Sequence, residues 1–196
     1  MLTPIVINDA GFANKAKVIL SPNFDSRPSK SNVNLIVIHN ISLPPGIYGG
    51  NNIIDLFTNK LNPDNHEYFK SISNLKVSSH FLIRRDGSLF QFVSCLERAW
   101  HAGESSWNQI NNCNDFSIGI ELEGLEGETF TEYQYESLIS LLPMLLSPIV
   151  AFFVALTIMV IMSLLLRKNT NPRKTNNFIR ELQVLSRSAL LIRYAI

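Results

Sequence analysis

The chain has 196 residues, of which 46% are hydrophobic and 17% are charged, a balance that excludes a disordered or fibrous protein. The net charge of +1 excludes a globally basic nucleic-acid binder, so we expect no nucleic-acid partner. Two cysteines are too few for a disulfide framework. The first ten residues contain Asp9 and no basic stretch, so we expect no secretory signal peptide and a cytoplasmic location.

Charge is distributed unevenly along the chain. Residues 1–166 carry a net charge of −5, residues 167–196 carry +6, and the 30 residues of 137–166 carry no charge at all. A shift of this kind is typical of a boundary between segments. We therefore expect one folded domain over 15–142, an apolar helix over 143–166 and a basic tail over 167–196.

The first strong element is the β-branched run Val33–Ile38, which predicts a buried strand that ends at His39-Asn40. Mixed strands and helices predict an α/β fold with a mixed central β-sheet flanked by helices. The other predicted elements are, in chain order, a short helix over Ile53–Asn59 capped by Asn51 or Asn52, a strand over Ser79–Arg84, a hairpin turn at Asp86-Gly87, a strand over Leu89–Val93, a strand over Phe116–Leu122, and a helix over Thr131–Leu142 capped by Thr129 or Thr131.

Two residues stand out as candidates for chemistry. His39 follows a buried strand, and a strand end is a rigid place from which to project a ligand or a base. Glu121 interrupts an otherwise apolar strand, where a carboxylate is costly unless it is paired or used. A buried glutamate would make a good general base. The alternative is that strand alternation simply points Glu121 and Glu123 to solvent.

Four ordered blocks resemble the cytoplasmic 1,6-anhydro-N-acetylmuramyl-L-alanine amidases, the AmpD enzymes. The blocks are Val37–Gly50 (VIHNISLPPGIYGG), Val77–Gly87 (VSSHFLIRRDG), Arg98–Gly103 (RAWHAG) and Cys113–Gly124 (CNDFSIGIELEG). The resemblance covers about residues 15–142. It implies a mixed sheet flanked by helices and a zinc-dependent hydrolase that cleaves the amide between (anhydro)N-acetylmuramic acid and L-alanine in muropeptides during peptidoglycan recycling.

The resemblance also implies roles for individual residues. His39 matches a zinc ligand, and Glu121 matches the general base that activates the metal-bound water. Asn40, His80 and Trp100 lie in blocks that line the family's cleft, so they are candidates for substrate contact or for support of the site.

The C-terminal quarter departs from the family pattern. The family takes its second zinc ligand from a Gly-His block and its third from an aspartate near the C-terminus, but this sequence has no histidine after His101 and no aspartate after Asp115. The run Pro172–Asn176 places Lys174 at the family's catalytic lysine, which would stabilise the oxyanion, and Asn176 at the position of the ligand aspartate. A neutral amide is a poor zinc ligand beside a carboxylate.

An apolar run over 147–166 stands where the family has these ligands, and its length suits a transmembrane helix that would contact a membrane. A frameshift is an alternative origin, because shifted codons for Met159–Arg167 permit a Gly-His block. True divergence of the sequence is the third possible origin of this segment. The sequence thus leaves open an amidase by descent, a muropeptide-binding module without catalysis, and a decayed, membrane-associated product.

Overall fold

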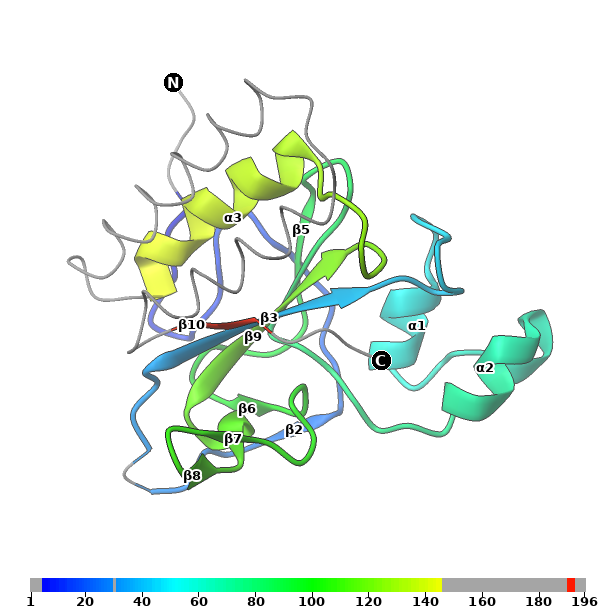
Figure 1. Ribbon diagram of the computed structural model, residues 1–196. Helices are drawn as coiled ribbons and strands as arrows, with labels where there is room; N and C mark the ends of the chain where they lie inside the picture. Colours follow the sequence, from blue (N-terminus) through cyan, green and yellow to red (C-terminus); the bar gives the residue numbers. More distant parts are fainter. Residues whose placement is uncertain (1–4, 30, 146–189, 193–196) are drawn as a thin grey trace.

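A computed structural model describes residues 5–29, 31–145 and 190–192 of the chain. A six-stranded sheet forms its centre, in the order β1-β5-β4-β9-β3-β10, with only the β4–β5 pair antiparallel (Figure 1). The strands of this sheet are β1 (Lys17–Val18), β3 (Leu35–Ile41), β4 (Phe81–Ile83), β5 (Leu89–Gln91), β9 (Ser117–Glu123) and β10 (Leu190–Ile192). The α/β fold with a mixed central sheet is therefore confirmed.

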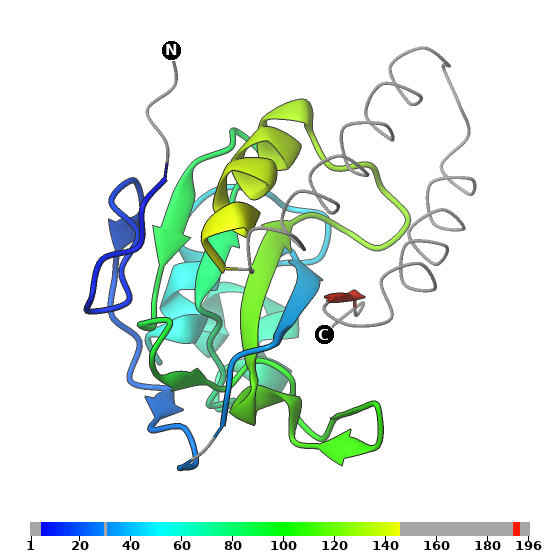
Figure 2. The ribbon, with the colours of Figure 1, turned by 90° about the vertical axis from the view of Figure 1, so that its left-hand side faces the viewer.

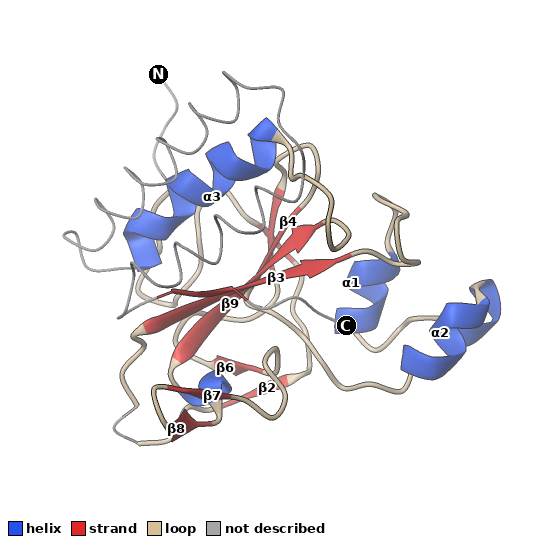
Figure 3. Cartoon of the chain, in the orientation of Figure 1, coloured by secondary structure: helices blue, strands red, loops and turns tan. Residues whose placement is uncertain are grey.

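Short elements surround the sheet, and Figure 3 separates the helices from the strands by colour. The helices are α1 (Asn52–Phe57), η1 (Pro63–Asn65), α2 (Glu67–Ile72), η2 (Cys113–Asp115) and α3 (Glu132–Leu145). Two small antiparallel pairs join β2 (Phe24–Asp25) to β6 (Arg98–Ala99) and β7 (Ser106–Trp107) to β8 (Ile110–Asn111).

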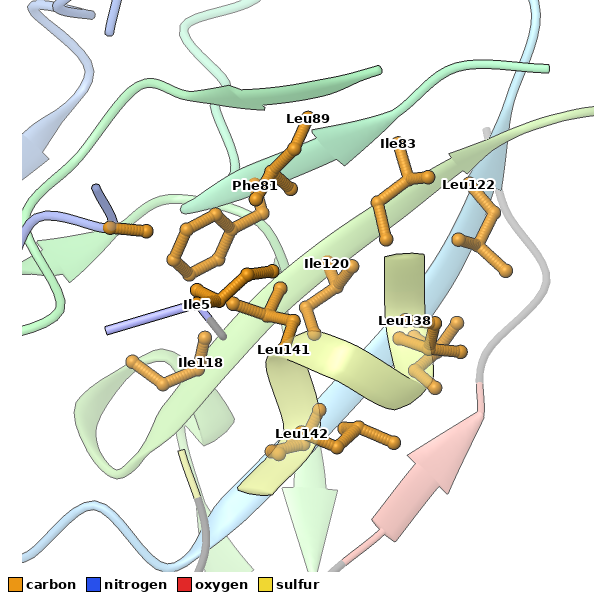
Figure 4. Close-up of a cluster of buried hydrophobic side chains, with 13 residues drawn as sticks. Ile5, Phe81, Ile83, Leu89, Ile118, Ile120, Leu122, Leu138, Leu141 and Leu142 are labelled. Carbon is orange, nitrogen blue, oxygen red and sulfur yellow. The ribbon is translucent and has the colours of Figure 1, made fainter. Parts of the chain in front are cut away.

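The two faces of the sheet are buried by different partners. One face packs against α3, which lies along the sheet in Figure 2. Figure 4 shows this cluster, in which Leu138, Leu141 and Leu142 of α3 meet side chains of β4 and β9. The other face meets α1, α2 and the loop that precedes β9. Because neighbouring residues of a strand point to opposite faces, this division decides which polar side chains share a side.

Helix α3 begins with a reciprocal cap. The backbone N–H of Gln134 donates to Thr131 Oγ1 at 3.2 Å, and the N–H of Thr131 donates to Gln134 Oε1 at 3.0 Å. This is the capping box expected of a Thr-x-x-Gln sequence. Of the two predicted caps, Thr129 and Thr131, it is Thr131 that caps the helix. The helix then continues past residue 142, through Pro143, to Leu145.

Several boundaries differ from the sequence prediction. Strand β3 does not end at His39-Asn40 but continues to Ile41, because β9 supplies a partner for every residue up to Ile41, which pairs with Glu123. Helix α2 was not predicted. The packed core also includes Ile5 and Ala13, which precede residue 15. Asn51 precedes α1 but makes no capping hydrogen bond with its side chain.

The unusual C-terminal quarter is described only at residues 190–192, where β10 pairs in parallel with β3. The predicted apolar helix over 143–166 lies outside the described residues beyond Leu145, and so does most of the basic tail. Of the helices that the structure describes, none has the length and apolar character that a membrane span requires. The membrane contact proposed for 147–166 therefore stays a prediction.

Candidate functional site

The structure brings His39 and Glu121 together. They are direct register partners on the adjacent parallel strands β3 and β9, so their side chains project from the same face of the sheet. This is the face opposite α3. His39 is 6% exposed and Glu121 is 7% exposed. The alternative that Glu121 and Glu123 point to solvent is wrong, since Glu123 is only 1% exposed.

Glu121 is buried because flanking segments cover its face of the sheet. Ala102, Cys113 and Phe116 pack over Leu35 and Val37 at one end of β3. A second cluster that includes Ile41 and residues of α1 and α2 covers the other end. The pair of His39 and Glu121 lies between these two clusters along the strands, so apolar packing limits access of water to the carboxyl group.

The Glu121 carboxyl group has an unusual environment. Its Oε2 atom is buried and finds no hydrogen-bond partner among the described residues. Burial disfavours the charged form and raises the pKa of Glu121 from its ordinary 4.5 to about 8. A carboxyl group with a pKa near neutrality can both accept and release a proton at physiological pH.

His101 is part of the site, although it was not among the residues predicted to act there. Its Nδ1 lies 3.0 Å from His39 Nε2, and its Nε2 lies 3.1 Å from Ser117 Oγ. Burial, together with the nearby rings of His39 and His80, holds the pKa of His101 well below its ordinary value. The sequence held a signal for this role, because His101 lies in the Arg98–Gly103 block, one of the four that resemble the family.

Gly119 makes room for the His101 ring. A Cβ atom on Gly119 would lie 2.4 Å from His101 Cγ, a distance that real Cβ contacts do not show. The backbone N–H groups of His101 and Ala102 both donate to Asn114 Oδ1, at 3.1 and 2.9 Å. The close approach to Gly119 therefore fixes the His101 ring, and the hydrogen bonds to Asn114 fix its backbone.

His80, one of the candidates for substrate contact or support, is completely buried. The N–H of Gly119 donates to its Nδ1 at 3.0 Å, and its Nε2 lies 3.1 Å from the carbonyl oxygen of Glu97. Desolvation lowers the pKa of His80 to about 3. The ring therefore ties β9 to the segment before β6, which suits support of the site rather than contact with a substrate.

The other two candidates have surroundings that differ from those of His39 and Glu121. Asn40 follows His39 in β3, so strand alternation places it on the opposite face, and its Oδ1 has no hydrogen-bond partner among the described residues. Trp100 is partly exposed beyond β6, and its side chain hydrogen-bonds Asp25, which helps to lower the pKa of that carboxyl group. Their predicted roles in substrate contact stay predictions.

Glu123 holds the loop that follows β3. Its Oε1 accepts from the N–H of Gly49 at 2.7 Å, and its Oε2 accepts from the N–H of Arg85 at 3.2 Å. Arg84 donates to the carbonyl of Gly50, and the guanidinium of Arg85 lies 4.9 Å from the ring centre of Tyr48. These contacts dock the loop segment that contains Tyr48, Gly49 and Gly50 beside the carboxyl ends of β3 and β9.

The described residues do not fit a catalytic zinc site. Such a site takes three protein ligands, and the described part of the chain holds no group of three histidine, cysteine, aspartate or glutamate residues able to share a metal. His39 is the one ligand that the resemblance assigns there. Lys174 and Asn176, the other residues matched to the family's site, lie outside the described residues.

Comparisons with known proteins agree with this architecture. Residues 29–148 match the family described as N-acetylmuramoyl-L-alanine amidase. The chain is 51% identical over 130 residues to the 1,6-anhydro-N-acetylmuramyl-L-alanine amidase AmpD of Citrobacter freundii, covering 66% of this chain and 70% of that one. It is 48% identical over 130 residues to the AmpD of Escherichia coli strain K12, covering 66% and 71%.

Solved structures show the same relation. A crystal structure of a selenomethionine AmpD derivative superposes with a TM-score of 0.67 at 49% identity, covering 68% of this chain and 75% of the other. The solution structure of Citrobacter freundii AmpD gives a TM-score of 0.51 at 48% identity, covering 71% and 75%. By its sequence match and its fold, the chain belongs to the N-acetylmuramoyl-L-alanine amidase family.

Proposed function

We propose that this chain is an amidase of peptidoglycan recycling that acts on the amide between (anhydro)N-acetylmuramic acid and L-alanine in muropeptides. The observation that carries the proposal is the pairing of His39 with Glu121 on adjacent strands, inside a segment about half identical to curated amidases of that specificity. The cytoplasmic location expected from the sequence is part of the same proposal.

Glu121 is the residue that we assign to proton transfer. Hydrolysis of an amide needs a base that takes a proton from water and an acid that returns one to the leaving amine. One carboxyl group serves both needs in turn when its pKa lies near neutrality, and burial gives Glu121 a pKa of about 8. The apolar clusters on either side limit exchange of that proton with bulk water.

A second function is favoured by a specific observation. Because no histidine follows His101 and no aspartate follows Asp115, where the resemblance expects the later zinc ligands, the domain is also a candidate for a module that binds muropeptides without cleaving them. The family fold and the docked loop around Gly49 and Gly50 would remain in such a module. The third possibility, a decayed product, concerns the segment 143–166, which the described structure reaches only as far as Leu145.

One pair of measurements on the full chain separates these functions. Binding of 1,6-anhydro-N-acetylmuramyl-L-alanyl peptide is followed by calorimetry, and release of the free peptide by mass spectrometry, with and without added zinc. The amidase predicts release that falls by about 10²–10⁴-fold in Glu121→Gln with binding retained. Glu136→Gln is the matched control, because it makes the same chemical change on the exposed side of α3.

Each outcome decides between the candidates. Binding without release under every condition would refute the amidase and support the binding module. Absence of both binding and release would refute both. Near-normal release by Glu121→Gln would keep the amidase but remove Glu121 from its mechanism.

A further inference from the structure

Helix α2 begins at a histidine cap. His66 precedes the helix in an extended conformation, with φ of −163° and ψ of 142°, and its Nδ1 accepts a hydrogen bond from the backbone N–H of Tyr68 at 3.1 Å. The carbonyl of His66 accepts from the N–H of Phe69 at 2.9 Å. Serine, threonine, aspartate and asparagine oxygens usually fill the capping role, so a ring nitrogen in this place makes the cap titratable.

A proton on the His66 ring removes this cap. A neutral imidazole offers one bare nitrogen as an acceptor, whereas an imidazolium carries hydrogen on both nitrogens and can only donate. The charged ring would therefore direct an N–H at the N–H of Tyr68. Its positive charge would also lie at the positive end of the helix dipole. Histidine is the side chain that ordinarily changes charge between pH 5 and pH 8.

The neighbouring groups do not replace the lost acceptor. The His66 ring is exposed and contacts the ring of Phe69, with ring centres 5.4 Å apart. The charged side chains of the two helices that meet at His66 are Asp64 in η1, and Glu67 and Lys70 in α2. Lys70 Nζ bonds Glu67 Oε2 at 2.7 Å, and in the described part of the chain none of these three side chains bonds the ring. The capping bond therefore depends on the protonation of the ring itself.

This cap matters for the site because α2 covers part of the face that carries Glu121. Phe69 and Ile72 of α2 belong to the same buried cluster as Ile41 of β3 and Leu82 of β4. Leu82 is the register partner of Glu121. A helix of six residues makes few hydrogen bonds of its own, so its order depends on this packing and on its cap.

We propose that His66 is a pH-sensitive cap, which holds the start of α2 while its ring is neutral and releases it when the ring gains a proton. Acidification is thereby coupled to the order of the helix that covers one end of the Glu121 face. The proposal is independent of the amidase function, because it concerns the helix and no substrate.

The test compares the full chain with two variants at pH 8 and pH 5. His66→Asn supplies an amide oxygen that caps at both pH values, and His66→Ala supplies no cap at either. Urea unfolding gives the unfolding equilibrium constant of each protein. We expect the constant of the wild type, relative to that of His66→Asn, to rise about 5-fold from pH 8 to pH 5 and to approach that of His66→Ala. Other titrating groups cancel from this ratio, because all three proteins contain them.

A second measurement follows the capping bond itself. In ¹H–¹⁵N spectra, the amide proton signal of Tyr68 should move upfield between pH 8 and pH 5 in the wild type and stay in place in His66→Asn. A ratio of unfolding constants that is the same at both pH values would overturn the proposal, and so would a Tyr68 signal that does not follow the titration of the His66 ring. Equal stability of His66→Asn and His66→Ala would show that α2 needs no cap, which also refutes it.

Discussion

Replacing Glu121 by glutamine is expected to change how the stability of the fold depends on pH. The folded protein binds the Glu121 proton more tightly than the unfolded chain, because burial raises the pKa from 4.5 to about 8. The associated stability is therefore fully present below pH 4.5 and is lost as the pH rises toward 8. Glutamine resembles the neutral carboxyl group at every pH, so Glu121→Gln should escape this loss.

The size of the effect follows from the shift. Each pKa unit corresponds to about 1.4 kcal/mol, so the free energy of unfolding of Glu121→Gln should gain about 3 kcal/mol on the wild type between pH 5 and pH 8. Urea unfolding of both proteins at several pH values measures this difference. Glu136→Gln, on the exposed side of α3, is the control and should follow the wild type. A constant difference between Glu121→Gln and the wild type across this range would refute the buried, neutral carboxyl group.

Three further predictions are tested by the same unfolding assay. Gly119→Ala should lower the free energy of unfolding by about 2 kcal/mol, because the added Cβ would lie 2.4 Å from His101 Cγ. An unchanged free energy of unfolding would show that the His101 ring is not held against Gly119. Gln109→Gly should raise the free energy of unfolding by about 1 kcal/mol, since Asn108 and Gln109 both have positive φ in the turn between β7 and β8, where glycine is under less strain. A lower free energy of unfolding would contradict backbone strain at Gln109. Burial lowers the pKa of His80 to about 3, so the free energy of unfolding of the wild type should fall relative to that of His80→Gln by about 1.4 kcal/mol per unit as the pH drops from 6.5 toward 3, and a constant difference between the two would exclude a neutral buried ring.

Local patterns in the sequence were sufficient to predict the main elements of the sheet. The β-branched run before His39 and the apolar run around Glu121 predicted β3 and β9, and Asp86-Gly87 predicted the turn between β4 and β5. These patterns reflect alternation and turn chemistry, which act over a few residues. The short helix α2 carries no comparable signal, since its formation depends on burying Phe69 and Ile72 against distant residues.

Residue identity and order are enough to assign the family, to select His39 and Glu121 as candidates, and to show that no histidine follows His101 and no aspartate follows Asp115. The burial of Glu121 could not be predicted in this way, since segments distant in the chain, the stretch 102–116 and the helices α1 and α2, cover its face of the sheet. The contacts that join His39 to His101 and His101 to Ser117 were likewise visible only in the structure. Which groups meet there depends on the register between β3 and β9 and on the path of the segment that carries His101, and both are set by contacts between residues far apart in the sequence.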